Sequence, residues 1–263
     1  MESQALVEFW CVEIQARSKP MQRVGIVLTG TLASMFPDMD AISLSSRFDR
    51  TFGRLLGLEH SGRVIYSSKF WYSHHAFLHS MVASVLFACL FISGILLAHR
   101  LRASSAQSLS SYFRKNIALW LAFVLGYWMH LAGDLPTPGS VWGGINLLWP
   151  AKSYVGGFGK IWWWNNYDIF LIVFAALLAN SVMLTISTWR KRSAMLFCSI
   201  VVLLSLIAVC IQINSRHTDY AYSGNTPNYE AFESQSKKEQ DRILGHRLYG
   251  AMSRLDGWVR VNF

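Results

Sequence analysis

Four apolar runs, each about as long as a bilayer is thick, constrain this chain more than any other feature of its sequence. A helix that crosses the hydrocarbon core needs about 20 largely apolar residues. Runs of that length cover residues 80–98, 117–135, 169–188 and 194–213. The sequence therefore predicts an all-α fold, a multi-pass transmembrane helical bundle with four strong spans.

A fifth apolar run, residues 24–36, is weaker, because it has only about 13 residues and contains Gly25 and Gly30. Three forms stay open for this N-terminal run: a tilted span, a re-entrant segment, or a helix packed among the others. The composition agrees with a membrane protein, since 52% of the residues are hydrophobic and only 15% are charged. An ordinary soluble domain has roughly 25% charged residues.

Polarity divides the chain into three predicted parts. They are an N-terminal segment (1–23), a membrane-embedded domain (24–213) and a polar, partly helical C-terminal tail (214–263). In the tail, apolar residues such as Leu244 and Leu248 recur at helical spacing, which predicts a small helix packed on the membrane part.

The formal net charge of +9 raises the question of a nucleic-acid partner. The basic residues gather instead in short stretches beside apolar runs, within 17–23, 100–115 and 190–192, and short basic loops stay in the cytoplasm. We therefore predict no nucleic-acid partner, a lipid bilayer as the surroundings, and an outer position for segments 37–80 and 134–168 and for the tail. The 37–80 segment and the tail nevertheless carry several Arg and Lys residues of their own.

Short pieces with ionisable side chains stand at the ends of the apolar runs. Asp38 and Asp40 can share a cation, although a Pro-Asp turn with a helix cap explains them equally well. His75 and His79 would share one helical face, whereas His74 and His79 converge only if the backbone turns between them. Neutral imidazole is the commonest metal ligand, and a pair of interfacial histidines with a helix cap is the alternative.

A further piece ends the second strong run, where His130 and Asp134 project from one helical face. A hydrogen bond between the two side chains is the plain alternative. In the predicted topology all these pieces lie at outer ends of their segments, and a metal site of nitrogen and oxygen ligands requires such convergence. Without a nearby thiolate, the site would hold a divalent metal ion, zinc first with manganese or iron as alternatives, and one or two ions.

The same pieces carry a family resemblance. Residues 37–40 resemble a Leu-Pro-Asp-x-Asp element, residues 74–80 a His-Arg-Gly-x-Thr-His-Ser element, and residues 125–150 a His-x-x-x-Asp…Thr…Gly…Leu-x-Pro element. In this order they are similar to the YdjM-type family of predicted membrane-bound metal-dependent hydrolases, over residues 25–150. The resemblance implies a protein of the bacterial cytoplasmic (inner) membrane that hydrolyses a phosphoester, with metal ligands at Asp38, Asp40, His74, His79, His130 and Asp134.

This chain departs from the family pattern at three places. His75, Ala76 and Leu78 stand where Arg, Gly and Thr are usual, no histidine precedes His60, and residues 140–147 lengthen the last element. The first departure changes how a phosphate is held, because Arg offers a bidentate fork and His does not. The missing N-terminal histidine would remove one ligand and with it a second ion, and either departure leaves open a family member that has lost catalysis.

The resulting expectation is a membrane-bound hydrolase that cleaves a lipid or lipid-linked phosphoester with a metal-activated water. His74, His79, His130 and Asp134 would bind the ion, and Asp38 or Asp40 would complete the site, with Asp40 as a catalytic base. His75 would donate a proton to the leaving group. The rival expectation is a non-catalytic membrane protein, either a structural partner or, less favoured, a transporter, whose His and Asp cluster is structural.

Overall fold

The computed structural model describes residues 20–103, 108–190, 193–225 and 228–258. Contacts divide the chain into two compact units, the first comprising Met1–Leu135 with Gly144–Val155 and the second Pro136–Gly143 with Gly156–Phe263. All regular elements in the described ranges are helical, and the β-bridges there are isolated ones. The predicted all-α class is confirmed, while the predicted domain boundaries stay predictions.

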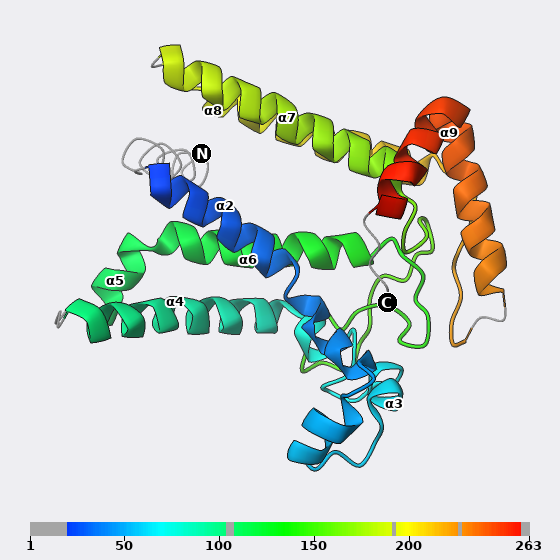
Figure 1. The fold of residues 1–263 in the computed structure, drawn as a ribbon, viewed down its shortest axis with the longest axis horizontal. Coiled ribbons are helices and arrows are strands. Elements are labelled where there is room, and N and C mark those ends of the chain that lie inside the picture. The colour runs from blue at the N-terminus through cyan, green and yellow to red at the C-terminus, as the bar shows by residue number, and fades with distance from the viewer. Residues whose placement is uncertain (1–19, 104–107, 191–192, 226–227, 259–263) are drawn as a thin grey trace. The chain divides into compact units, whose positions relative to one another are not determined.

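The first unit is built on three long helices, α2, α4 and α6, which lie side by side (Figure 1). Short helical turns connect α2 to α4 at the end where α2 and α6 finish and α4 begins, and α5 connects α4 to α6 at the other end. The elements in chain order are α2 (Pro20–Ser34), the 3₁₀ helix η1 (Pro37–Leu44), the π-helical turn η2 (Asp49–Gly53), α3 (Gly62–Tyr66), the 3₁₀ turn η3 (Phe77–His79), α4 (Met81–Ala103), α5 (Leu109–Lys115) and α6 (Ile117–Asp134).

Small residues let α2 and α6 approach closely. A Cβ added at Gly126 on α6 would lie 2.1 Å from the carbonyl oxygen of Gly30 on α2, so the two backbones touch. Ala33 and Ala83 are fully buried in the adjoining core, where Tyr127 also has no exposed surface. Close backbone approach at small residues is how helices associate where no water drives them together. The N-terminal run forms a helix packed against α6, and its place in the membrane stays a prediction.

The second unit contains α7 (Tyr167–Arg190), α8 (Met195–Asn214) and α9 (Tyr229–Trp258). Helices α7 and α8 form an antiparallel hairpin, and α9 packs against α7. Helix α9 is kinked at Gly245, whose φ of 74° interrupts the helical backbone. The predicted helix in the tail is confirmed, and it is longer than the small appendage expected from the spacing of its apolar residues.

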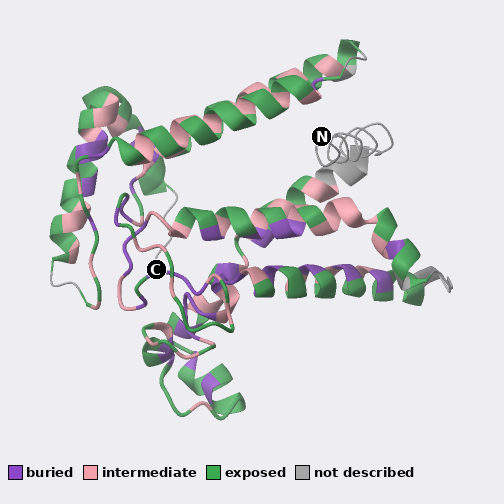
Figure 2. Ribbon diagram, turned by 180° about the vertical axis from the view of Figure 1, so that it is seen from behind, coloured by how far each residue is buried: buried purple, intermediate pink, exposed green. Residues whose placement is uncertain are grey.

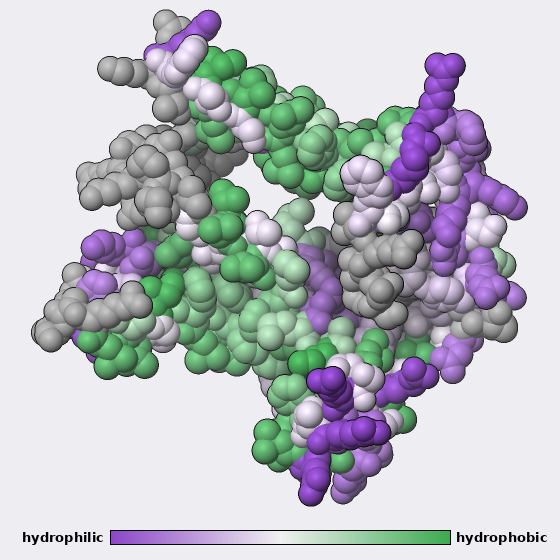
Figure 3. Space-filling view, in the orientation of Figure 1, coloured by the Kyte–Doolittle hydropathy of each residue, from purple (hydrophilic) through white to green (hydrophobic). Residues whose placement is uncertain are grey.

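The helices long and apolar enough to span a membrane number four in the described residues: Met81–Leu101, Ile117–Asp134, Tyr167–Ser187 and Met195–Asn214. Their boundaries fall within a few residues of the four strong spans predicted from sequence. Exposed and intermediate residues line most of their length (Figure 2), and these surfaces are apolar (Figure 3). An apolar outer surface of this kind suits contact with lipid. Of the basic residues that predicted orientation, Arg17, Lys19, Lys191 and Arg192 lie outside the described residues.

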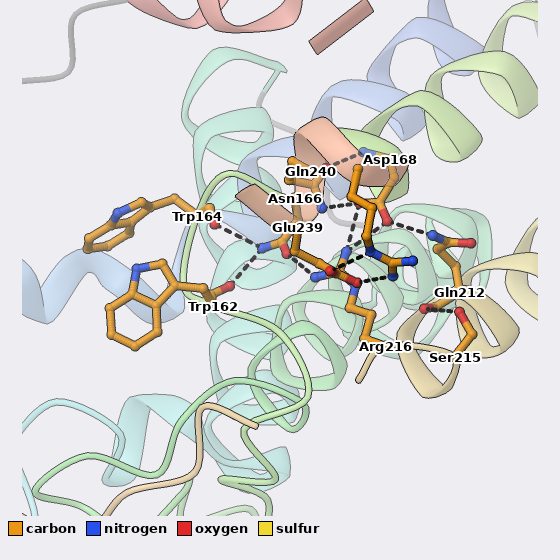
Figure 4. Close-up of polar contacts among 10 residues, drawn as sticks. Trp162, Trp164, Asn166, Asp168, Gln212, Ser215, Arg216, Glu239 and Gln240 are labelled. Carbon is orange, nitrogen blue, oxygen red and sulfur yellow. Dashed lines mark hydrogen bonds and ion pairs between the residues drawn. The ribbon is translucent and has the colours of Figure 1, made fainter. Parts of the chain in front are cut away.

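A buried polar network joins the three helices of the second unit (Figure 4). Arg216, just after α8, donates from Nη2 to both carboxylate oxygens of Asp168 on α7, at 2.7 and 2.9 Å. Gln240 on α9 and Gln212 on α8 donate to the same carboxylate, at 3.0 and 2.9 Å. A buried charge pair persists when its remaining hydrogen-bonding positions are satisfied, and these amides satisfy them. The network therefore fixes α9 to the α7–α8 hairpin.

Candidate metal centre

The candidate site lies within the first unit, where η1, η3 and the last turn of α6 meet. Helix η1 follows α2 directly, with buried Pro37 at its first position, so its acidic residues stand close to the end of α2. Helix η3 precedes α4. These elements bring together all the side chains predicted from sequence as site residues: Asp38, Asp40, His74, His75, His79, His130 and Asp134.

A backbone turn makes the histidine convergence possible. His75 has a φ of 62°, in the left-handed region that non-glycine residues rarely adopt, and η3 follows two residues later. The rings of His74 and His79 consequently lie 4.7 Å apart between centroids. Tyr127 on α6 donates from its hydroxyl to the Leu78 carbonyl oxygen, which ties the turn to the helix bundle. The convergence therefore depends on a turn that the helical spacing did not specify.

Two imidazole nitrogens and two carboxylate oxygens lie close together in this cluster. The Nε2 atom of His79 lies 3.6 Å from Asp38 Oδ1 and 3.7 Å from Asp134 Oδ2. The Nε2 atom of His130 lies 3.4 Å from each of the same two oxygens. Hydrogen bonds between nitrogen and oxygen span about 2.7–3.2 Å, so these contacts are too long. Both Nε2 atoms are buried and have no hydrogen-bond partner among the described residues.

The same distances fit the coordination shell of a metal ion. Zinc binds imidazole nitrogen and carboxylate oxygen at about 2.0–2.1 Å in tetrahedral geometry, which places neighbouring ligand atoms about 3.3–3.4 Å apart. The four nitrogen–oxygen separations of 3.4–3.7 Å are close to that value, and the ligand atoms of Asp38, His79 and His130 all lie within 4.8 Å of one another. A chain that held these groups together by hydrogen bonds alone would bring them closer. The donor set could therefore hold a divalent cation.

Asp40 lies on the opposite edge of the His79 ring. Its Oδ1 atom is 2.6 Å from His74 Nδ1, a normal hydrogen bond, and its Oδ2 atom is 3.7 Å from His79 Nδ1. A carboxylate facing the second nitrogen of a metal-binding histidine typically orients the ring. The geometry thus sets Asp40 and His74 apart from the nitrogen and oxygen atoms of Asp38, His79, His130 and Asp134, although both were predicted as ligands. Nitrogens of His74, His75 and His79 also lie within 4.8 Å of one another, a second group that suits a cation.

Burial sets the protonation of these groups. His79 has no exposed surface, and its burial lowers the pKa of the imidazole below its ordinary value. Burial, with His74 and His79 alongside, also places the pKa of His75 well below the usual range. Burial raises the pKa of Asp38, but contacts with His130 and His79 outweigh it and hold that pKa below its ordinary value. Neutral histidines beside an ionised carboxylate are the forms that bind metal.

Exposure shows from which side the cluster is reached. The side chain of Asp38 is 55% exposed, whereas those of His130 and Asp134 are 16% and 18% exposed. His79 and Asp40 lie beneath them at 0% and 8%. Asp38 therefore forms the open side of the cluster, where a ligand from outside can reach it.

The segment 144–147 supports the histidine turn, and its role was not predicted. The carbonyl oxygen of Gly144 lies 3.1 Å from His75 Nδ1, and the backbone N–H of Asn146 donates to the His75 carbonyl oxygen at 2.8 Å. The N–H of Met81 donates to the Leu147 carbonyl oxygen at 3.0 Å. The only signal in the sequence was the greater length of residues 140–147 relative to the family pattern. Length alone does not reveal which backbone groups a segment presents.

Comparison with known proteins returned one family. The family model described as YdjM inner membrane protein matches residues 2–216, which include every residue of the candidate site. No curated protein and no solved structure matches the chain.

Proposed function

Since the chain belongs to the YdjM inner membrane protein family, it is a protein of the inner membrane, and we propose that it is a metal-dependent hydrolase there. The proposed substrate is a lipid or lipid-linked phosphoester. The observation that carries the proposal is the set of separations of 3.4–3.7 Å among four side-chain atoms on η1, η3 and α6. A purely structural cluster would satisfy its buried ring nitrogens with hydrogen bonds.

In this proposal Asp38, His79, His130 and Asp134 bind one divalent cation. A bound cation would polarise a phosphoryl oxygen and lower the pKa of a water towards neutrality. Asp40 Oδ2 faces Nδ1 of the His79 ring at 3.7 Å, beyond hydrogen-bond distance, and the hydrogen bond between Asp40 Oδ1 and His74 Nδ1 supports an orienting role for this carboxylate. Asp38, being the most exposed ligand, faces the approaching substrate.

His75 keeps its proposed role as proton donor to the leaving group. Its contact with the Gly144 carbonyl group supports a fixed ring orientation, with the Nδ1 proton directed at that oxygen. The second histidine group, His74, His75 and His79, is where a second ion would bind if the protein takes two.

The depth of the site supports an amphiphilic substrate. His79 immediately precedes α4, and Asp134 is the last residue of the apolar span in α6. Both therefore stand at the ends of spans, at the level of lipid headgroups. The connection between α4 and α6 at the opposite ends of these helices carries Arg100, Arg114 and Lys115, which favours the cytoplasm for that end and the outer face for the site.

Metal content of the detergent-purified protein, measured by elemental mass spectrometry, is the direct test. We expect near-stoichiometric zinc, manganese or iron in the wild type and its loss in His79→Ala and in His130→Ala. His99→Ala is the matched control, because His99 is an exposed histidine near the far end of α4. Circular dichroism establishes that each variant keeps its helices.

The same preparations then decide the reaction. Metal-loaded wild type should hydrolyse a chromogenic phosphodiester or a fluorescent phospholipid, and both ligand variants should be inactive at equal helix content. A well-folded wild-type protein that takes up no metal after resupply would refute the proposed metal-dependent hydrolase. Bound metal without hydrolysis of any phosphoester would refute the proposed reaction but would support the metal centre.

A further inference from the structure

Residues 41–72, which run from the second half of η1 almost to η3, fold into a small compact substructure that we call the elbow. Figure 1 shows it to one side of the axis of α4, at the end of α4 that follows η3. Phe48 and Ile65 are buried inside it, and the N–H of Gly62 donates to Asp49 Oδ1 at 2.7 Å. A Cβ at Gly62 would lie 2.0 Å from the Ser43 carbonyl oxygen. The elbow is therefore an ordered structure and not a loose loop.

Large apolar side chains cover the outside of the elbow. A soluble surface rarely exposes so many of them in one place unless they contact a partner or a membrane. Leu55 is 79% exposed, Leu56 65% and Trp71 64%, and the remaining exposed apolar residues are Ile42, Leu44, Phe52 and Val64. In the space-filling view, apolar and strongly polar surfaces lie next to each other on the lower part of the molecule (Figure 3).

The polar part of the same surface is basic. Arg47, Arg50, Arg54 and Arg63 are all exposed, and none forms an ion pair with any residue that the structure describes. A fifth cation, Lys69, lies 5.0 Å from the centre of the Tyr154 ring. Asp49 and Glu59 are the only acidic residues of the elbow. The elbow therefore has an excess of basic residues. Such an excess is unusual for a segment predicted at the outer face, because basic loops usually stay in the cytoplasm.

We infer that the elbow lies on the bilayer surface and binds the phosphates of anionic lipids. The elbow lies to one side of α4, at the level where that helix begins. Its exposed leucines would therefore lie at the boundary between acyl chains and headgroups. Guanidinium groups bind phosphate oxygens through two parallel hydrogen bonds. Apolar side chains beside basic ones are the pattern of segments that lie in the membrane interface. The inference goes beyond the proposed hydrolase and needs no metal ion.

Lipid-borne quenchers test this placement in the full chain. Leu55→Cys is labelled with an environment-sensitive fluorophore after Cys11, Cys89, Cys198 and Cys210 are replaced by serine. The protein is placed in nanodiscs of phosphatidylcholine with a minority of phosphatidylglycerol. In one sample only the phosphatidylglycerol carries brominated acyl chains, and in the other an equal amount of phosphatidylcholine carries them.

We expect strong quenching, at least about twofold greater when the anionic lipid carries the bromine, because each basic side chain near the surface attracts anionic lipid. The preference should vanish in the triple variant Arg47→Gln, Arg50→Gln and Arg54→Gln. It should persist in the matched control Lys238→Gln, Arg247→Gln and Arg254→Gln, which removes the same charge from exposed positions of α9.

The other outcomes overturn the inference. A label that is quenched by aqueous iodide and not by bromine would put the elbow in water. Protection from both quenchers would mean that a second copy of the chain or another protein covers it, and the mass of the particle distinguishes these two cases. Equal quenching from both lipids would refute the binding of anionic headgroups. Metal content, measured on the same samples, reports separately on the hydrolase proposal.

Discussion

Replacing Gly126 by alanine should weaken metal binding, although Gly126 contacts no proposed ligand directly. Gly126 lies one helical turn before His130 on α6, against Gly30 of α2. Helix α2 leads through Ser34 into η1, which carries Asp38. The contact between the two glycines therefore sets the separation between Asp38 and His130.

The structure gives the size of the expected displacement. The added Cβ would lie 2.1 Å from the Gly30 carbonyl oxygen, whereas real Cβ atoms essentially never come within 3.0 Å of such a neighbour. The helices must separate by about 0.9 Å, the difference between the two values. Overpacking of this kind costs roughly 1–3 kcal/mol of stability. A ligand set must be held to about 0.5 Å, so we expect metal affinity to fall by roughly 10- to 100-fold.

Competition with a chromophoric chelator measures this affinity in detergent, and thermal unfolding followed by circular dichroism measures stability. Gly30→Ala is the matched control, since its Cβ would lie 3.4 Å from the Ala122 carbonyl oxygen, an ordinary contact. It should bind metal as the wild type does. Wild-type affinity in a folded Gly126→Ala protein would refute the reasoning that the α2–α6 contact positions Asp38.

Three further predictions test other parts of the structure. Asp40→Asn should lower metal affinity by roughly 10- to 100-fold without changing the number of ions bound, because the charge facing both His74 and His79 is lost. An unchanged metal titration would exclude the orienting role of Asp40. Arg216→Met should destabilise the protein by roughly 3–5 kcal/mol in thermal unfolding, because it leaves the Asp168 carboxylate buried without its cation. Its metal content should match the wild type, since the proposed ligands lie in the other unit. Gly62→Ala should increase proteolysis within residues 41–72, because its Cβ has no room beside Ser43, and protection equal to wild type would show that the elbow adapts.

The sequence determined the elements that depend on local composition. A run of apolar residues long enough to cross a bilayer has no other stable form in lipid than a helix, so the four strong spans were predicted within a few residues. Ionisable side chains at the ends of those runs also stood out, because such residues are costly at that depth. The candidate site could be named from these positions and from the order of the motifs.

Tertiary structure decided which of these side chains face a common point. The φ of 62° at His75 and the Gly144 carbonyl contact bring His74 and His79 together from positions that helical spacing would separate. The same packing sets Asp40 behind the His79 ring and Asp38 on the open side. It also turned the short N-terminal run into a helix against α6 and buried the Asp168–Arg216 pair. These features depend on contacts between residues far apart in the chain, for which hydropathy and local spacing carry no information.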